Sequence, residues 1–573
     1  MHTFTRTVAG REYRILQVTE RVPGKKNPVT HQVSLGPVAS KDLLDPSRCE
    51  EVGSKRVGDV AALISVAEEL GVLDAFSEAA PRVGKGPSLG EMILAVALQR
   101  VCAPGPKRDL PAFLDGSLPR FAARPVSEFT GQVFHRVTRA VQEAVYEKVQ
   151  LAIAQRACER FRLKTDVLAY DSTNFDTFIA TTTDSELAKR GHAKSKRDDL
   201  RVVGLALMTS STASVPLFHR TFAGNESDKE VLGDTLDALA KLHKMLGDAD
   251  RTLVRDGGFA GEQLDLRLEK SGYHSVSVLA LSTTIARDAL TAAVGNLRPL
   301  PGKLRDISAW RVRVTTETLD RTLVVVESPE LLEGQLRGLR RATRLSLRDL
   351  RKIAKRVETE RAGKTGGRRY TVTSLKRRVE KALAREHMAA IIDVQVGGEE
   401  TAPTIEFQLN QEKRRQLVRE RLGKRVIVTD QHDWSTERIV RTFRSQWKVE
   451  RAFRRMKRGE VSPWGPSYQW TDDSIRAHTF ATVLGLQLAT LARLHLERAG
   501  IKKTTKGSID LLASIKLTRL HARQEGRGGP REVLVPAQLD RAARKAAALF
   551  GVEQWTTLFS ATAARPSATR TGA

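Results

Sequence analysis

Residues 166–175 have the sequence DVLAYDSTNF, a short apolar run that ends at an acid, Asp171. The run predicts a buried strand. Two more strand-like runs follow, RVVGLALMTS at 201–210 and VPLFHRTF at 215–222, and the short polar segment between them predicts a hairpin. Next come a helical pattern at 234–246 and two strand patterns, RTLV at 251–254 and YHSVSVLAL at 273–281. These elements predict an α/β domain with a buried sheet.

The order of strand, hairpin, helix and strand is that of an RNase H-like core. A long insertion from about 284 to 425 interrupts this core, with strand-like runs WRVRV and RTLVVVES followed by basic helices. The core pattern resumes at KRVIVTD, residues 424–430. A cap at Ser435 predicts a long helix over 436–458, and a second helix is predicted over about 472–499. The predicted fold class is therefore α/β, with an RNase H-like catalytic core interrupted by an α+β insertion.

The chain divides into six predicted regions, with helical regions on both sides of the core. Runs YRILQV and THQVSL flank a PGKKNP turn near the N-terminus and predict a small hairpin, while the helical patterns that follow could bind DNA or pack on a neighbour. The predicted regions are a β-hairpin region at 1–50, a helical and DNA-binding region at 51–164, the first part of the core at 165–283, the basic insertion at 284–425, the second part of the core at 426–500, and a C-terminal helical region with a disordered tail at 501–573.

The charge balance predicts a polyanionic partner. The 573 residues include 95 Lys and Arg against 67 Asp and Glu, a formal net charge of +28. Because the cations run through the whole chain, nucleic acid is favoured over a merely solubilising surface. Between Arg337 and Arg385 there are 18 cations and only four acids. This segment predicts either direct DNA contact or a charged helical hairpin with a solvated face.

Several other classes of protein are disfavoured by the motifs that the sequence lacks. Cys49, Cys102 and Cys158 are far apart, with no CxxC pair or zinc spacing, which fits a reducing compartment. The first residues lack an apolar core of signal length, and the most apolar stretch, near 480–496, is interrupted by polar residues. No GxxxxGK[ST] loop is present. We therefore expect a cytoplasmic protein, associated with the bacterial nucleoid when bound to DNA, with no membrane partner.

Two aspartates follow apolar strand patterns. Asp171 follows VLAY and Asp256 follows TLVR, so both are predicted near strand ends, where sites in α/β sheets are usually built. Taken singly, each could instead be a turn former or a helix cap. Their joint position in one core favours a shared site.

A glutamate is predicted on the helix that follows. On a 3.6-residue period, Phe443, Trp447, Glu450, Arg454 and Lys457 share one face, which places Glu450 in a largely apolar stripe. A carboxylate there costs free energy unless it is paired or binds a metal. An ion pair between Glu450 and Arg454 is the alternative.

Three converging carboxylates predict a metal site. Mg²⁺ or Mn²⁺ prefers such hard oxygen ligands and leaves positions for phosphate oxygens. Two such ions could activate the attacking oxygen and stabilise the leaving one at phosphorus. The predicted metal ligands and catalytic residues are Asp171, Asp256 and Glu450.

An ordered set of motifs resembles the DDE transposases of bacterial insertion sequences. The motifs are YDSTNF, GHAKSKRDDLRVVGLAL, VPLFHRTFAGNESD, RDGGFAG, GKRVIVTD, WKVERAFRRMK and YQWTDDSIRAHTF. The superfamily carries a Y-x2-R-x3-E-x6-K signature, to which Phe443, Gln446, Glu450 and Lys457 correspond here, with Phe for Tyr and Gln for Arg. Within it the chain is most similar to the branch called IS sixteen-thirty-four.

The resemblance implies a DDE transposase that uses Asp171, Asp256 and Glu450 with Mg²⁺ or Mn²⁺, two ions per site. It would cleave DNA at the terminal inverted repeats of an insertion sequence and join the ends to target DNA, as a homodimer or higher oligomer. Cations expected to bind DNA are Lys194, Lys196, Arg197, Arg454 and Lys457, although a solvated loop is the alternative for the first three. The alternative functions are an RNase H-like nuclease without strand transfer and an inactive or domesticated DNA-binding protein.

Overall fold

The fold is available as a computed structural model of the chain. It describes residues 2–8, 11–20, 29–37, 49–80, 82, 84–117, 125–211, 213–247, 249–259, 261–315, 320–364, 369–522, 531–536 and 539–552.

A nine-stranded sheet organises the molecule, in the order β10-β11-β12-β15-β9-β8-β5-β6-β7. Its members are β5 (Val167–Thr177), β6 (Arg201–Ser210), β7 (Pro216–Ala223), β8 (Arg251–Val254), β9 (Tyr273–Leu279), β10 (Arg298–Pro299), β11 (Ser308–Thr315), β12 (Asp320–Glu327) and β15 (Lys424–Thr429). The first three strands pair antiparallel, and β8 and β9 continue from β5 in parallel. The order β7-β6-β5-β8-β9 confirms the RNase H-like core.

Strands from the insertion widen this sheet rather than forming a separate one. β15 pairs antiparallel with β9, and β12, β11 and β10 follow outward. The strand-like runs predicted in the insertion are therefore part of the central sheet. Helices α7 (Asp228–Met245), α8 (Glu262–Lys270) and α9 (Thr284–Ala293) connect or cover these strands.

The helical regions on either side of the core pack together into one hydrophobic cluster with it. The long helix α16 (Asp472–Arg498) contacts α3 (Leu89–Cys102) and β7, and it is buried over most of its length. A capping box of Ser88 and Glu91 begins α3. Despite this apolar character, no described helix is long and apolar enough to cross a membrane. The other helices of the N-terminal region are α1 (Gly58–Glu69), α2 (Val72–Ala79), α4 (Leu110–Ser117), α5 (Gly131–Thr138) and α6 (Glu143–Phe161).

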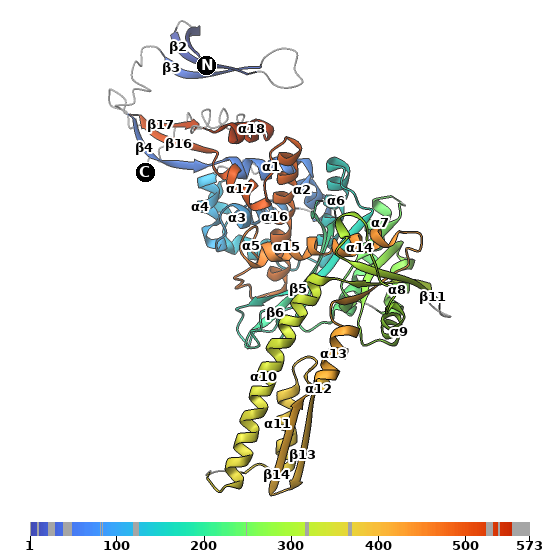
Figure 1. Cartoon of the computed structure of the whole chain (residues 1–573). Helices are drawn as coiled ribbons and strands as arrows, with labels where there is room; N and C mark the ends of the chain where they lie inside the picture. Colours follow the sequence, from blue (N-terminus) through green and yellow to red (C-terminus); the bar gives the residue numbers. More distant parts are fainter. Residues whose placement is uncertain are drawn as a thin grey trace.

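The rest of the insertion forms an arm that extends away from the sheet (Figure 1). It comprises α10 (Pro329–Arg361), α11 (Val372–Leu383), α12 (Met388–Ile391), β13 (Ile392–Glu399), β14 (Ala402–Leu409) and α13 (Gln411–Glu420). Leu350, Leu375 and Met388 are fully buried in a hydrophobic cluster of the arm's own. The basic segment is therefore a packed α+β unit, not a bare helical hairpin.

Strands at the two ends of the chain differ from the sequence prediction. At the N-terminus β1 (His2–Val8), β2 (Arg11–Glu20) and β3 (Val29–Pro37) form a three-stranded sheet, where a hairpin was predicted. The C-terminal region was predicted as helical, and it contains α17 (Thr505–Ala513) and α18 (Arg541–Leu549). It also contributes β16 (Lys516–Ala522) and β17 (Arg531–Pro536), and β16 pairs with β4 (Cys49–Arg56). The predicted disordered tail lies outside the described residues.

The single long helix predicted over 436–458 is wrong. Ser435 caps α14 (Thr436–Arg444) as expected, but the helix ends there and α15 (Trp447–Lys457) begins after a turn at Ser445 and Gln446. The two helices are therefore separate elements, and Glu450 lies on α15 together with Trp447, Arg454 and Lys457.

Close backbone contact fixes the loop that leads to Lys194. Lys189 and Val202 exchange backbone hydrogen bonds, and the Gly224 amide donates to the Leu187 carbonyl at 3.0 Å. A Cβ at Gly224 would overlap the carbonyl oxygen of Val202, which is backbone and cannot move aside. Only glycine, which has no Cβ, allows the backbone at position 224 to lie this close to Val202.

We predict that Gly224→Ala lowers the free energy of unfolding by about 1–3 kcal/mol because of this overlap. Gly338→Ala is the matched control, since its Cβ would meet nothing within 4 Å on α10. Alanine there should be neutral or stabilising by up to about 1 kcal/mol. Urea denaturation followed by tryptophan fluorescence measures both, and equal effects of the two substitutions would contradict the packing argument.

Candidate active site

The register between β5 and β8 brings two acids level with each other. Ala169 pairs with Val254 in the parallel ladder. Asp171 and Asp256 each follow two residues later, so they lie at the same height and on the same face. Asp171 was expected at a strand end, but β5 continues to Thr177, and only its pairing with β8 ends at Ala169. Asp256 follows β8 as predicted.

Asp171 is half-buried, and its surroundings favour a neutral carboxyl. Burial raises the pKa of Asp171 to about 7, while Lys194 and the Ser172 amide act to lower it. The negative charges of Asp256 and Glu450 raise it further. Asp256 and Glu450 are therefore both close enough to Asp171 for their charges to act on its carboxyl group.

Glu450 is exposed on α15, and the predicted apolar stripe around it is wrong. The buried face of α15 consists of Val449, Ala452, Phe453, Arg455 and Met456. Trp447 is 49% exposed, so it does not bury the glutamate. The alternative ion pair with Arg454 is not formed either, and Glu450 has no ion pair with any other residue that the structure describes. Its carboxylate is therefore left free beside the aspartates.

Two lysines reach the residues next to Asp171. Lys457 Nζ donates to Thr173 Oγ1 at 2.5 Å, and Lys194 Nζ donates to the Ser172 carbonyl at 2.6 Å. Lys457 is exposed overall, yet burial of its ammonium group lowers its pKa to about 8, and the charge of Lys194 acts in the same direction. Both cations thus lie close to Asp171.

The remaining predicted cations are exposed, and no contact among the described residues holds them at the acids. Arg197 is engaged by Asp199 through two hydrogen bonds of 2.7 Å. Lys196 lies in the same loop, and Arg454 lies on α15 beyond Glu450. Phe443 and Gln446, the altered signature positions, are buried at the break between α14 and α15.

Sequence reasoning missed a fourth acid beside the site. The Ser172 hydroxyl, next to Asp171, donates to Asp228 at the start of α7. The Asp228 carboxylate also lies near Gly258, two residues after Asp256. It therefore connects the strand and the turn that carry the two predicted aspartates. The Ser227–Glu230 capping box marks the start of α7 in the sequence, but it does not reveal that Asp228 meets Ser172.

The donor set fits a hard divalent cation, although the acids are not gathered into a closed cage. Among the described residues, no group of three or more His, Cys, Asp or Glu side chains is close enough to hold a metal by itself. Asp171, Asp256 and Glu450 nevertheless offer carboxylate oxygens without an ion-pair partner in the described part of the chain. Their mutual repulsion would be relieved by a cation.

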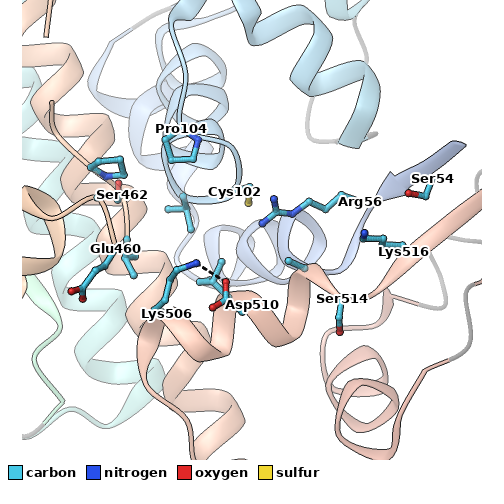
Figure 2. A pocket seen from close by; sticks show the side chains of 16 residues that line it. Ser54, Arg56, Cys102, Pro104, Glu460, Ser462, Lys506, Asp510, Ser514 and Lys516 are labelled. Carbon is cyan, nitrogen blue, oxygen red and sulfur yellow. Dashed lines mark hydrogen bonds and ion pairs between the residues drawn. The ribbon is translucent and has the colours of Figure 1, made fainter. Parts of the chain in front are cut away.

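A cavity in the described structure lies away from these acids. It measures about 600 Å³, and Arg56, Cys102, Lys506 and Lys516 are among its lining residues. Figure 2 shows Lys506 paired with Asp510 within it. Glu460 and Ser462 form one wall, so the cavity reaches only the segment that follows α15. It is not the site of the three carboxylates.

The strand order, with Asp171 on β5 and Asp256 just after β8, gives the chain an RNase H-like fold. The chain belongs to the DDE transposase family, because residues 162–460, which are more than half of the sequence, match the transposase DDE domain. The protein is thus a transposase-family enzyme that acts on DNA. The matched region contains all three predicted acids and both lysines.

One solved structure and the curated proteins complete the comparison. The chain is similar to a structure described as a piggyBac transposase synaptic complex with hairpin DNA, with 9% identity and a TM-score of 0.38. The match covers 89% of this chain and 87% of the other. No curated protein matches the chain.

A buried arginine outside the matched region holds the segment that follows α15. Arg100, on α3, donates to the carbonyls of Pro463 at 2.8 Å and Gly465 at 3.2 Å. Between them, Trp464 stacks on Phe175 of β5 with ring centroids 4.8 Å apart. The Lys457 ammonium lies 5.5 Å from the same Phe175 ring. The N-terminal helices therefore support β5 and Lys457 through this segment.

We predict that Arg100→Met lowers the free energy of unfolding by about 2–4 kcal/mol, because the buried Pro463 carbonyl and the part-buried Gly465 carbonyl lose their donor. Trp464 should become more accessible, with a red shift of tryptophan emission. Arg108→Met is the control, since the Arg108 side chain is 86% exposed. Urea denaturation and emission spectra measure both, and an Arg100→Met protein as stable as the control would refute the supporting role.

Proposed function

We propose that this enzyme catalyses metal-dependent cleavage of DNA at the ends of an insertion sequence and joins those ends to target DNA. The supporting observation is the convergence of Asp171, Asp256 and Glu450 on an RNase H-like core beside Lys194 and Lys457. The sequence signature around Glu450 and Lys457 supports the bacterial insertion-sequence branch of the family.

In this proposal Asp171, Asp256 and Glu450 hold Mg²⁺ or Mn²⁺, with two ions per site. Bound ions of this kind would activate an attacking oxygen and stabilise a leaving oxygen at phosphorus. Asp171 binds them as a carboxylate, so it must lose the proton that its raised pKa of about 7 favours. Asp228 keeps Ser172 in place through its hydrogen bond and thereby positions Asp171.

The two lysines supply the charge that holds the DNA strand. Lys194 and Lys457 orient the phosphate through charge-assisted contacts, and Lys196, Arg197 and Arg454 contact the backbone farther out. Water as nucleophile gives end cleavage, and the freed 3′ hydroxyl as nucleophile gives strand transfer. One arrangement of side chains serves both steps because only the nucleophile changes.

The partners in this proposal are double-stranded terminal repeats and target DNA. Two or more copies of the chain assemble on paired ends, so that both ends reach one target. The net charge of +28 supports attraction to DNA along much of the surface. Bacterial nucleoid association follows from DNA binding.

We predict that Asp171→Asn, Asp256→Asn and Glu450→Gln each reduce Mg²⁺-dependent cleavage of the flanking repeats by about 10³-fold or more, with DNA binding retained. Asp288→Asn, an exposed acid on α9, should cleave like wild type. Gel assays of cleavage and joining measure these effects. Cleavage without joining would favour a nuclease, and wild-type binding without cleavage would favour an inactive DNA-binding protein.

The pKa of Lys457 predicts a pH dependence of DNA binding. With a pKa of about 8, Lys457 is charged below pH 8 and loses its charge as the pH rises through this value. Wild-type affinity for DNA, measured in EDTA, should therefore fall between pH 7 and pH 9, by up to about 10-fold for one lost contact. Lys457→Arg should bind without this fall because a guanidinium stays charged. The same fall in both proteins would rule out Lys457 as its source.

A further inference from the structure

One face of α10 carries an uninterrupted row of cations. Arg337, Arg340, Arg341, Arg344, Arg348, Arg351, Lys352 and Lys355 are all exposed. At about 100° per residue they fall within a sector of about 120° around the helix axis. We call these eight residues the cation ridge.

Acidic residues do not neutralise most of the ridge. Between its ends α10 contains one acid, Asp349, which is bound by Arg385 at 2.8 Å and Arg348 at 3.2 Å. Glu333 pairs with Arg337 at the near end. The other six cations form no ion pair with another described residue: Arg340, Arg341, Arg344, Arg351, Lys352 and Lys355. This differs from a helix whose surface is covered by alternating charges.

Packing on the opposite face holds the ridge in place. Leu339 and Leu350 are buried, and the Ser346 hydroxyl donates to the Ala382 carbonyl of α11 at 2.8 Å. Glu360 accepts from Arg356 and from the Tyr370 amide, which fixes the far end of the helix. These contacts fix the position of the helix that carries the cation ridge.

The ridge is long enough to follow a duplex. It spans 18 residue steps, or about 27 Å at 1.5 Å per residue, which is about 8 base pairs of DNA. α10 starts directly after β12 of the central sheet, and the arm extends from there (Figure 1). A duplex on the ridge would therefore extend beyond the acids.

We propose that the cation ridge binds the sugar–phosphate backbone of duplex DNA that lies outside the cleaved position. This rests on the proposed function for the identity of the DNA, but its binding step needs neither the metal nor the three acids. Because the row spreads positive charge along the length of a duplex, it suits contact with successive phosphates, which carry no sequence information. Contact with the cation ridge increases the affinity for DNA but does not determine which DNA sequence is bound.

The test compares two triple variants of the full chain that lose equal charge. Arg340→Gln, Arg344→Gln and Arg351→Gln remove part of the ridge, while Arg298→Gln, Lys303→Gln and Arg305→Gln remove exposed cations near β10. Binding to an arbitrary duplex of about 40 base pairs is measured in EDTA across a salt series. Circular dichroism and thermal melting verify that both variants are folded.

For three lost phosphate contacts, the slope of log affinity against log salt should fall in magnitude by about 2.7 in the ridge variant and stay near the wild-type slope in the control. Between 50 and 200 mM salt, the ridge variant should therefore lose about 40-fold less affinity than the wild-type protein loses. Equal slopes in the two variants would overturn the proposal and leave a solvated face. If wild type fails to cleave but the ridge variant shows the reduced slope, the proposed function fails and the ridge stands.

Discussion

The parallel pairing of β5 with β8 is the constraint on which the site depends. Ala169 opposite Val254 sets Asp171 and Asp256 at one level, and a shift of one residue would send one carboxylate to the other face. Every other group at the site is placed relative to this pair. Lys457 reaches it through Thr173, and Asp228 reaches it through Ser172.

Holding like charges together requires support from outside the sheet. Asp171 is half-buried near two other acids, which disfavours its charged form. The chain surrounds this position with rigid contacts, including the Phe175–Trp464 stack and the anchoring of the 463–465 segment by Arg100. The N-terminal helices, whose predicted role included DNA binding, contribute this support through α3. The site is therefore a product of regions far apart in the sequence.

The sequence predicts what local patterns determine and fails where distant contacts decide. Apolar runs predicted the strands of the core and the order that makes it RNase H-like. The face of Trp447, Glu450 and Lys457 was predicted to be apolar, but it is the exposed face of α15, because Val449, Phe453 and Met456 form the buried one. The break before α15 was missed because neither Ser445 nor Gln446 is a glycine or proline that would predict it. The pairing of β4 with β16 joins residues more than 450 positions apart, which no local period reveals. Asp228 was missed for the same reason, since only the folded chain brings it to Ser172.

The attachment of the arm to the central sheet relates the position of the arm to that of the acids. The arm leaves the sheet after β12 and returns through β15, and these two strands pair with each other beside β9. An arm fixed at two neighbouring strands cannot pivot as freely as one attached by a single linker, because both attachment points are hydrogen-bonded in one sheet. Charge carried on such an arm keeps a defined distance from the acids. A duplex bound along it would be held in one orientation relative to Asp171 and Asp256, so orientation of the DNA follows from the topology of the sheet.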